Sequence, residues 1–365
     1  MRVAIVHDWL VTNAGAEKVL KEIVAIYPNA DIFSLVDFLS DSQRKEIING
    51  KTVTTSFLQH LPLAKTHFRN YLPFFPKAIE SLDLNGYDLI ISSSWAVAKG
   101  VKKTDEQKHI CYCHTPIRYA WDLYDEYVSS LTQPKKFMVE KTLQYIKKWD
   151  LESLDRVDYF IANSNFVKER IERLYKREAI VIYPPVDTKK FTLYEAKEEF
   201  YLTASRLVPY KKTKLIVEAF NEMPEKKLVV IGAGEEYEVI QKIAGKNITV
   251  LGYCDDHIMV DTMQRAKAFV YAAVEDFGIG PIEAQACGTP VIALNEGGTA
   301  ETVVDGLNGI HFKKQSKEDI ISAVQRFESL EFDTKEVSQS THSFSKKRFK
   351  QEMMEFVNLK ITEQK

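Results

Sequence analysis

VEDFGIGPIEAQACGTPVIALNEGGTAETV (274–303) is the stretch of sequence that decides the fold. The apolar run AFVYAAV (268–274) leads into it and predicts a buried strand that ends beside Glu275. Gly278 and Gly280 then allow a tight turn, and the proline that follows suits the first turn of a helix. Because free N–H groups at a helix start bind anions, we expect a diphosphate at this turn.

A second carboxylate lies just inside the predicted helix. Glu283 can accept two hydrogen bonds from a ribose diol there, while Gly297 and Gly298 form another glycine-rich turn near the same edge. Taken alone, Glu275 and Glu283 could be solvated charges, since acids are favoured at helix N-termini. The order strand, Glu, Gly, Gly, Pro, helix, Glu favours a nucleotide site instead.

Cations follow another predicted strand of the same half. SRLVPYKK (205–212) comes directly after FYLTAS (200–205). Arg206 and Lys211 can neutralise a diphosphate as it leaves, when negative charge grows on its oxygens. Lys212 could take the place of Lys211. A run of this kind is otherwise a solvated basic loop, but its place at a strand's carboxyl end favours the site.

Outward from these motifs, short apolar runs alternate with amphipathic helical stretches along almost the whole chain. This alternation predicts parallel sheets wrapped by helices. Helices are expected at 16–27, 165–175 (capped by Ser164 or Asn165) and 345–361. Strands are expected at 2–6, 88–94, 109–113, 159–164, 200–205, 227–232, 248–252, 268–274 and 290–294.

The alternation pauses at VIYPPVDTKKF (181–191), where two prolines stiffen the chain, so this is the candidate linker. A length of 365 residues fits two domains. We expect a Rossmann-like domain at 1–185 on the acceptor side and a nucleotide-sugar-binding one at 192–343. Two doubly wound sheets would face a central cleft at the carboxyl ends of their strands.

Two features of the N-terminal half could reach the same cleft. VHDWLVTNAGAEK (6–18) reads as strand, loop and helix, with Gly15 at a second anion-facing turn. HICYCHTP (109–116) places His114 just past a strand, where it could bind a donor-sugar hydroxyl, although a lone histidine is more often structural. Cys111 and Cys113 have no second cysteine pair, and we expect both on one face of a buried strand.

Several sequence patterns that would indicate other functions are absent. No two aspartates are two positions apart, so the D-x-D pairing of many metal-dependent sugar transferases is absent, and we expect no metal and no cofactor. GAGEEY (232–237) lacks the third glycine of a dinucleotide motif. A net charge of −2 gives no support for nucleic-acid binding, and four scattered cysteines indicate a reducing compartment. The N-terminus does not resemble a signal peptide, so a cytoplasmic protein is expected.

On these residues the chain resembles the retaining family 4 glycosyltransferases of the GT-B fold. The C-terminal signature is EAQACGTPVIA (283–293) with SRLVPYKK. The N-terminal half is similar to a bacterial subgroup of mannosyltransferases in surface polysaccharide assembly. The matching stretches are HDWL (7–10), YDLIISSSWAVAKG (87–100), CYCHTPIRYAWDLYDEY (111–127) and IANSNFV (161–167).

The resemblance implies roles for the matching positions. Glu275 would contact the donor sugar, Glu283 the ribose, and His114 would stand near the transferred sugar. The remaining expected donor contacts are Gly15, Arg206, Lys211, Gly232, Phe277, Gly278, Ile279 and Gly280. Ala14 departs from relatives that carry a second glycine, which leaves the N-terminal loop open. The final helix, 344–365, often crosses back to the N-terminal domain in this fold.

The expected reaction is hexose transfer with retention, and GDP-mannose is the leading donor by resemblance. The acceptor would be a glycan or a polyprenyl-diphosphate-linked saccharide of lipopolysaccharide or O-antigen synthesis. The alternatives are a nucleotide-sugar epimerase, a sugar phosphorylase, or a catalytically silent binding subunit that keeps the fold. An epimerase would alter the donor sugar without an acceptor.

A peripheral position on the inner face of the cytoplasmic membrane is a further expectation. SFLQHLPLAKTHFRNYLPFFPKAIE (56–80) mixes eight large apolar residues with Lys65, Arg69 and Lys77, which suits an anionic membrane surface. The other interpretation is a helical excursion packed on the N-terminal sheet. PKKFMVEKTLQYIKKW (134–149) could extend the same basic surface.

Overall fold

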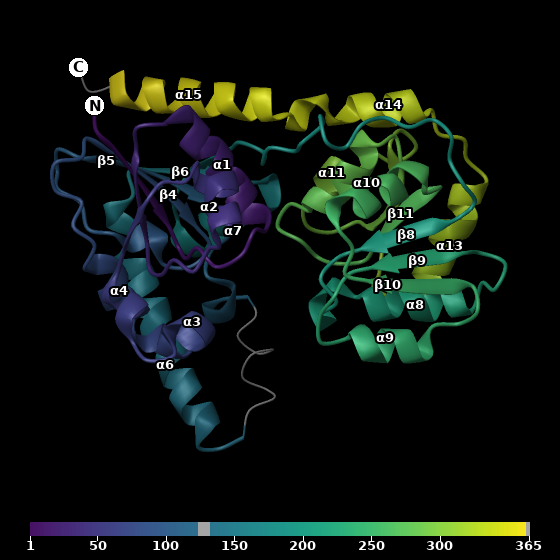
Figure 1. Cartoon of the computed structure of the whole chain (residues 1–365), viewed down its shortest axis with the longest axis horizontal. Helices are drawn as coiled ribbons and strands as arrows, with labels where there is room; N and C mark the ends of the chain where they lie inside the picture. The colour runs from purple at the N-terminus through teal and green to yellow at the C-terminus, as the bar shows by residue number, and fades with distance from the viewer. Residues whose placement is uncertain (123–131, 363–365) are drawn as a thin grey trace. The chain divides into compact units, whose positions relative to one another are not determined.

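The computed structural model describes residues 1–122 and 132–362, which form two compact units. Unit 1 comprises Met1–Tyr183 and the chain from Phe349 onward, and unit 2 comprises Pro184–Arg348. The boundary between Tyr183 and Pro184 falls inside the segment predicted as the linker. Figure 1 shows each unit as a sheet with helices packed on it. The cleft expected between the domains stays a prediction.

Unit 1 is built on a parallel sheet whose described strands run in the order β3-β2-β1-β4-β5-β6-β7. The strands are β1 (Val3–His7), β2 (Asp31–Ser34), β3 (Val53–Thr55), β4 (Leu89–Ser94), β5 (Lys108–Cys113), β6 (Tyr159–Ala162) and β7 (Ala179–Val181). The longer helices are α1 (Gly15–Ile26), α2 (Asp41–Ile48), α6 (Lys135–Glu152), α7 (Asn165–Tyr175) and α15 (Lys346–Thr362). The order reverses between β1 and β4, and ligands of open α/β sheets bind at such a switch point.

Unit 1 also contains several short helices. They are α3 (Ala64–His67), α4 (Phe75–Glu80), and the 3₁₀ turns η1 (Phe57–His60), η2 (Phe68–Phe74), η3 (Ala98–Gly100), η4 (Arg118–Ala120) and η5 (Leu154–Arg156). Predicted strand 159–164 is shorter in the structure, because Ser164 caps α7 by accepting a hydrogen bond from Val167 N at 3.0 Å. The strands β2, β3 and β7 were not predicted.

Unit 2 repeats the plan with a sheet whose described strands run in the order β10-β9-β8-β11-β12-β13. The strands are β8 (Tyr201–Ala204), β9 (Leu228–Ile231), β10 (Ile248–Gly252), β11 (Ala268–Tyr271), β12 (Val291–Leu294) and β13 (Gly309–Phe312). The helices are α8 (Thr213–Asn221), α9 (Tyr237–Ile243), α10 (Asp256–Arg265), α11 (Ile279–Ala286), α12 (Thr299–Thr302), α13 (Lys317–Glu328) and α14 (Thr334–Gln339), with 3₁₀ turns η6 (Pro209–Lys211) and η7 (Ser340–Phe344). Its switch point lies between β8 and β11.

Each sheet has apolar cores on its two faces, because its central strands are buried on both sides. In unit 1 the C-terminal helix closes one core. Phe349, Met353 and Val357 recur every four residues along α15 and are fully buried against residues of β1 and β5. From Phe349 onward the last helix therefore packs on unit 1, although the residues before it belong to unit 2.

The aromatic segment 56–80 is mostly core. Leu58, Phe68 and Phe75 are buried and pack beside Trp9, while Leu61, Tyr71 and Leu72 are half-buried against the same core. Of the eight apolar residues, Phe57 and Phe74 are exposed. The structure therefore favours the helical excursion over a membrane-facing segment here, because the aromatic side chains that could enter a lipid surface fill the space under the sheet.

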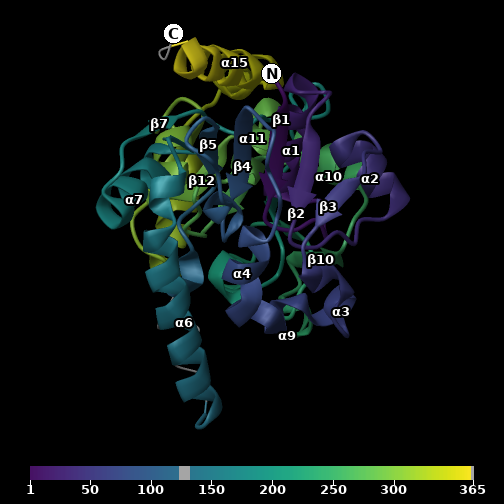
Figure 2. The same ribbon diagram turned by 90° about the vertical axis from the view of Figure 1, so that its left-hand side faces the viewer.

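Helix α6 differs from the other helices of unit 1 in its first turns. Figures 1 and 2 show its beginning extending away from the sheet. Leu143, Ile146 and Trp149 are buried in its second half, whereas Phe137 and Met138 are 57% and 67% exposed. No helix among residues 1–122 and 132–362 is long and apolar enough to span a bilayer.

Candidate active site

Two of the residues predicted to bind a diphosphate sugar, Lys211 and Glu275, meet at the switch point of unit 2. Lys211 ends the turn that follows β8, and Glu275 follows β11, the neighbouring strand. Strand β11 ends at Tyr271, three residues earlier than predicted, and Glu275 lies in a separate bridge to Gly297. The carboxyl ends of β8 and β11 therefore bring together two side chains that are 64 residues apart.

Lys211 and Glu275 form an ion pair. The ammonium nitrogen Nζ of Lys211 lies 2.5 Å from Oε1 of Glu275 and 3.3 Å from the hydroxyl oxygen of Tyr271. Both partners of the pair are mostly buried, with side chains 16% and 18% exposed. Burial alone would lower the pKa of Lys211, but Tyr271 and Glu275 outweigh it and raise that pKa above its ordinary value. Lys211 is therefore a fixed cation.

Glycines hold the Glu275 loop in place. Gly297 adopts φ +72°, and a Cβ there would lie 2.4 Å from the carbonyl oxygen of Glu275. A Cβ on Gly298 would lie 2.3 Å from Cα of Phe277. The N–H of Gly298 also donates to the Glu275 carbonyl at 2.8 Å. This second glycine turn thus positions the site by close backbone packing.

Helix α11 begins beside that loop. Gly278 is its N-cap with φ +84°, and Ile279 and Gly280 already belong to the helix, slightly before the start expected at the proline. The first N–H groups of a helix have no intrahelical acceptor, so this end can bind an anion. Glu283 lies one turn further and is 8% exposed. The ring of Phe277 is buried and packs edge-on against Phe344, so any donor contact of Phe277 would come from its backbone.

Arg206 is exposed on the loop after β8. Its guanidinium donates to the hydroxyl of Tyr210 at 2.5 Å, and the same ring has Lys211 Nζ 5.5 Å from its centroid. Gly232, after β9, has φ +147°, and a Cβ there would lie 1.8 Å from the carbonyl oxygen of Ser205. Gly232 therefore shapes the Arg206 loop by close backbone contact. Lys212 instead begins α8 in a left-handed conformation.

In unit 1 a buried aspartate joins the ends of the two strands at the switch point. Asp8 follows β1, and its carboxylate accepts four backbone N–H groups of residues 95–98, after β4, at 2.6–2.9 Å. This contact fixes the two strand ends with respect to each other. One of these residues, Trp95, also packs against the ring of His114, the histidine that the sequence singled out.

His114 lies one residue beyond β5 and is 9% exposed. Its Nε2 lies 2.8 Å from the Ser93 hydroxyl, which in turn lies 3.1 Å from Nδ1 of His7. Trp95 and Tyr112 pack edge-on against the His114 ring. Burial, with His7 adding to it, lowers the pKa of His114 to about 3, so the imidazole is neutral near pH 7.

Gly15 opens helix α1 and is exposed, as expected for an anion-facing turn. The same helix end already holds a carboxylate. Glu17 is 2% exposed and accepts the N–H of Ala14 at 3.0 Å, and its other oxygen lies 3.9 Å from Nε2 of His7. The Glu17 carboxylate thus partly neutralises the positive end of the α1 dipole. Helix α11 has no acidic residue in its first turn.

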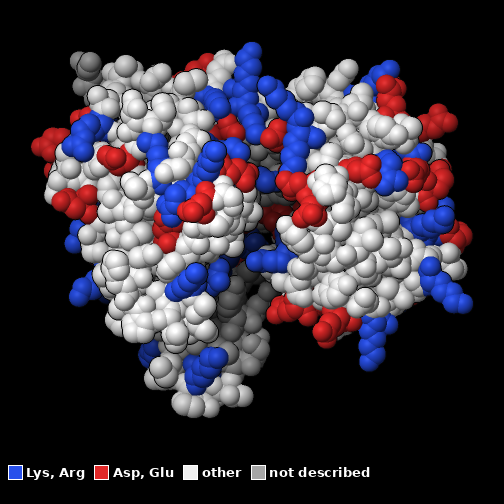
Figure 3. Space-filling view, in the orientation of Figure 1, with Lys and Arg blue, Asp and Glu red and all other residues white. Residues whose placement is uncertain are grey.

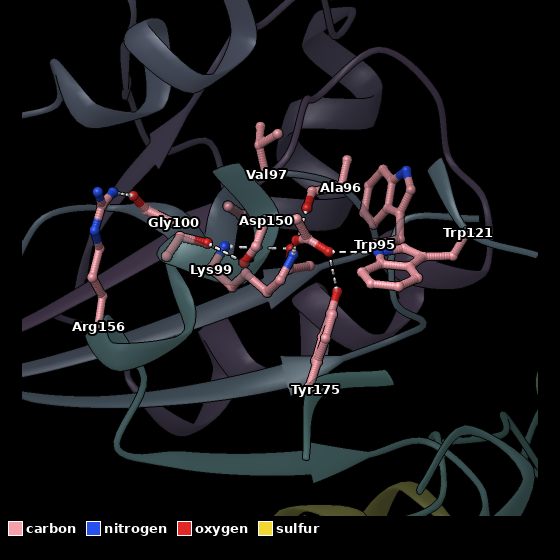
Figure 4. A network of polar contacts seen from close by, with 12 residues as sticks. Trp95, Ala96, Val97, Lys99, Gly100, Trp121, Asp150, Arg156 and Tyr175 are labelled. Atoms are coloured by element: carbon pink, nitrogen blue, oxygen red, sulfur yellow. Dashed lines mark hydrogen bonds and ion pairs between the residues drawn. The ribbon is translucent and has the colours of Figure 1, made fainter. Parts of the chain in front are cut away.

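A buried ion pair underlies this part of unit 1 (Figure 4). Lys99 and Asp150 are 1% and 0% exposed and pair directly. Asp150 also accepts from Trp121 Nε1 at 2.9 Å and from the Tyr175 hydroxyl at 2.8 Å. The cluster ties η3, α6 and α7 to the segment that follows His114. The part of CYCHTPIRYAWDLYDEY at 123–127 lies outside the described residues.

Cys111 and Cys113 are fully buried on one face of β5 and share a core cluster, as predicted. Among the described residues, no three His, Cys, Asp or Glu side chains are placed to hold a metal ion. A metal-free reaction stays a prediction. In unit 2 the charge of a diphosphate can be met by Arg206, Lys211 and the α11 terminus together.

Sequence reasoning missed Ser93, which contacts His114, and His7 and Glu17, which are linked to Ser93 in turn. It also missed Tyr271, which accepts from Lys211. His7 and Ser93 are registered neighbours on β1 and β4. Polar residues at the last positions of otherwise apolar strands were the available signal, since such positions face the edge where ligands bind.

Both units match glycosyltransferase families. Residues 186–348 match the family described as Glycosyl transferases group 1, and residues 15–190 match the one described as Glycosyltransferase Family 4. Among solved structures, the Anabaena protein HepE in complex with UDP-glucose superposes with a TM-score of 0.71 at 18% identity, covering 98% of this chain and 100% of that one. That likeness concerns the fold, which is GT-B as predicted.

Three curated relatives share parts of the sequence. An uncharacterized glycosyltransferase of Methanocaldococcus jannaschii is 28% identical over 56% of this chain and 58% of its own length. A GDP-mannose-dependent monoacylated alpha-(1-6)-phosphatidylinositol monomannoside mannosyltransferase of Corynebacterium glutamicum is 34% identical over 27% and 30%. An alpha-1,3/1,6-mannosyltransferase of Candida glabrata is 24% identical over 71% and 68%. The chain thus spans little more than half of the first relative and under a third of the second.

Proposed function

We propose that this chain, which carries a group 1 and a family 4 glycosyltransferase domain, is a retaining hexosyltransferase that uses GDP-mannose. The acceptor is a glycan or a polyprenyl-diphosphate-linked saccharide of bacterial surface polysaccharide synthesis. The observation that carries the proposal is the Lys211–Glu275 pair beside the start of α11. Two relatives described as mannosyltransferases support mannose as the sugar.

The arrangement supplies the charges that this reaction needs. The bond between the anomeric carbon and the diphosphate oxygen breaks, and the acceptor oxygen bonds to the same face of that carbon. The acceptor's proton passes to the departing phosphate oxygen. Arg206, Lys211 and the α11 N–H groups stabilise the negative charge that develops there, and Glu275 accepts from sugar hydroxyls. No side chain is required as a base.

A thermal-shift panel of GDP-, UDP- and ADP-sugars in the presence of EDTA tests the donor. We expect GDP-mannose to raise the melting temperature by about 5 °C at concentrations near a hundred times Kd, because a ligand of the native state stabilises it. The EDTA excludes a contribution from divalent metal. The other nucleotide sugars should shift the transition less.

Transfer to a saccharide acceptor, followed by analysis of the anomeric configuration, completes the test. A larger shift with a UDP- or ADP-sugar would contradict GDP-mannose. Conversion of the donor sugar without an acceptor would indicate an epimerase, and binding without any turnover would indicate a silent binding subunit.

We also propose that unit 1 docks on an anionic membrane through the first turns of α6, where a lipid-linked acceptor would be found. Phe137 and Met138 are exposed there beside Lys135, Lys136 and Lys141. On the face shown in Figure 3, the end of unit 1 with α3, α4 and α6 is largely uncharged surface with separate Lys and Arg side chains. Exposed apolar side chains with cations suit a lipid interface.

Liposome flotation tests the membrane proposal. The protein should float with phosphatidylglycerol vesicles at low ionic strength and much less at about 0.5 M salt, because salt screens attraction to the surface. A Phe137→Ser/Met138→Ser variant should stay at the bottom of the gradient. Tyr253→Ser removes an aromatic residue of unit 2 that is 79% exposed and serves as the matched control. Recovery of no wild-type protein at low salt would refute membrane docking.

A further inference from the structure

Four buried side chains of unit 1 form a line that ends at His114. Glu17 lies 3.9 Å from His7 Nε2, the Ser93 hydroxyl lies 3.1 Å from His7 Nδ1, and His114 Nε2 lies 2.8 Å from the same hydroxyl. His7 and Ser93 are fully buried and Glu17 is 2% exposed. Water therefore has little access to these contacts, and their proton positions depend on one another.

The serine hydroxyl has one proton and lies against two imidazoles. If Ser93 donates to His7, it must accept an N–H from His114 Nε2. If it donates to His114, it must accept an N–H from His7 Nδ1. The tautomer of one histidine therefore fixes the tautomer of the other.

Glu17 selects between these two states. Within the described residues, His7 Nε2 is buried without a hydrogen-bond partner, and the Glu17 carboxylate is the anion that faces it. A protonated Nε2 is favoured there, because its N–H is attracted to the negative carboxylate, whereas the lone pair of an unprotonated Nε2 would be repelled by it. His7 therefore has its proton on Nε2, and its Nδ1 accepts from Ser93.

We infer that Glu17, acting through His7 and Ser93, holds His114 with its proton on Nε2 and presents Nδ1 as a hydrogen-bond acceptor. In residues 1–122 and 132–362, no hydrogen bond reaches Nδ1 of His114. This makes Glu17, His7 and Ser93 positioning residues.

The tautomer of His114 determines which chemical group of a ligand can hydrogen-bond to its Nδ1. A lone pair on Nδ1 accepts from a hydroxyl and repels a phosphate oxygen. Together with the proposed function, on which this step rests, His114 contacts a hydroxyl of the transferred hexose and not its diphosphate. A neutral imidazole near pH 7 agrees with this assignment, since a charged one would attract phosphate instead.

A second histidine supplies an internal reference. His109 Nδ1 lies 2.8 Å from the carbonyl oxygen of Arg156, which can only accept, so His109 has its proton on Nδ1. Its Nε2 then accepts from Ser92 at 2.8 Å. His109 and His114 should therefore show opposite tautomers in the same molecule.

Nitrogen-15 NMR of histidine-labelled full-length protein at about pH 8 tests the inference, because the two ring nitrogens give different shifts in each tautomer. We expect an unprotonated Nδ1 on His114 and a protonated one on His109, assigned with His114→Asn. In a Glu17→Gln variant we expect His7 and His114 each to adopt the opposite tautomer. Its amide oxygen takes the N–H of Ala14, so its NH₂ faces His7 Nε2, moves the His7 proton to Nδ1, and leaves His114 protonated on Nδ1.

Glu22→Gln is the matched control, since it removes another buried carboxylate of α1 that pairs with Lys350 and not with His7. It should leave the His114 tautomer unchanged. Donor affinity should fall by about tenfold in Glu17→Gln, the value of one neutral hydrogen bond. The inference is overturned if wild-type His114 is protonated on Nδ1, if His7 is doubly protonated, or if Glu17→Gln leaves His114 unchanged. These readings need no substrate, so they are independent of whether the protein transfers mannose.

Discussion

A Glu275→Gln variant is expected to fold normally and to transfer sugar about a hundredfold to a thousandfold more slowly than the wild type. The amide keeps the volume of the side chain, but it replaces one acceptor oxygen by an NH₂ group. That group either faces the Lys211 ammonium, 2.5 Å from Oε1 in the native site, or loses the contact to a sugar hydroxyl. Steady-state transfer with GDP-mannose, beside a melting curve, measures both outcomes. Glu275→Ala should abolish transfer by removing both oxygens.

Glu296→Gln is the matched control for this variant. Glu296 is exposed and precedes the glycine turn that packs on Glu275, so its replacement changes the same charge nearby. It should retain near wild-type transfer.

Lys211→Met should lose activity to a similar extent as Glu275→Gln, and Lys212→Met should not. Unchanged transfer in Glu275→Gln would refute the role assigned to that residue.

Unit 2 could be predicted in some detail because its signal is local. Glu275, Gly278 and Glu283 lie within ten residues, and the strand before them is an uninterrupted apolar run. The chain order of strands and helices then fixes where the carboxyl ends meet. The proximity of Glu275 and Lys211 could be predicted in the same way, since both motifs come directly after predicted strands.

The two edge strands of unit 1 gave no such signal. β3 (VTT) and β7 (AIV) are three residues long and partly exposed, so an apolar run is not needed to form them. They exist because a neighbouring strand offers its free N–H and C=O groups. Composition also misled at 56–80, since Phe68 and Phe75 read as surface aromatics beside lysines while the structure packs them under Trp9. Contacts between distant segments decide such cases.

The polar groups around His114 were equally hidden. His7, Ser93 and Glu17 come from separate elements, and nothing in their spacing links them before the sheet order is known. The same holds for Lys99, which lies among apolar residues in the printed sequence and reads as a surface lysine. Its burial is explained only by Asp150, 51 residues later on α6.

An Asp150→Asn variant is expected to destabilise unit 1 by about 3–5 kcal/mol, the cost of leaving one charge of a buried pair alone. Lys99 would then lie in the core with an amide in place of its counter-ion. The amide NH₂ would be a donor that faces either the Lys99 ammonium or, in the flipped orientation, the Trp121 N–H and the Tyr175 hydroxyl, which both donate to Oδ2 in the native structure. The loss should therefore exceed that of an ordinary hydrogen bond.

Urea unfolding followed by tryptophan fluorescence measures this loss in unit 1 alone. The four tryptophans of the chain, at positions 9, 95, 121 and 149, all lie in that unit, so unfolding of unit 2 does not contribute. Glu152→Gln is the matched control on the same helix, because Glu152 pairs with Lys148 at 3.6 Å in solvent, with side chains 59% and 77% exposed. Exposed pairs of this kind contribute about 0.3–0.5 kcal/mol. If the midpoints of Asp150→Asn and Glu152→Gln coincide, the buried carboxylate and its contacts do not hold this unit together.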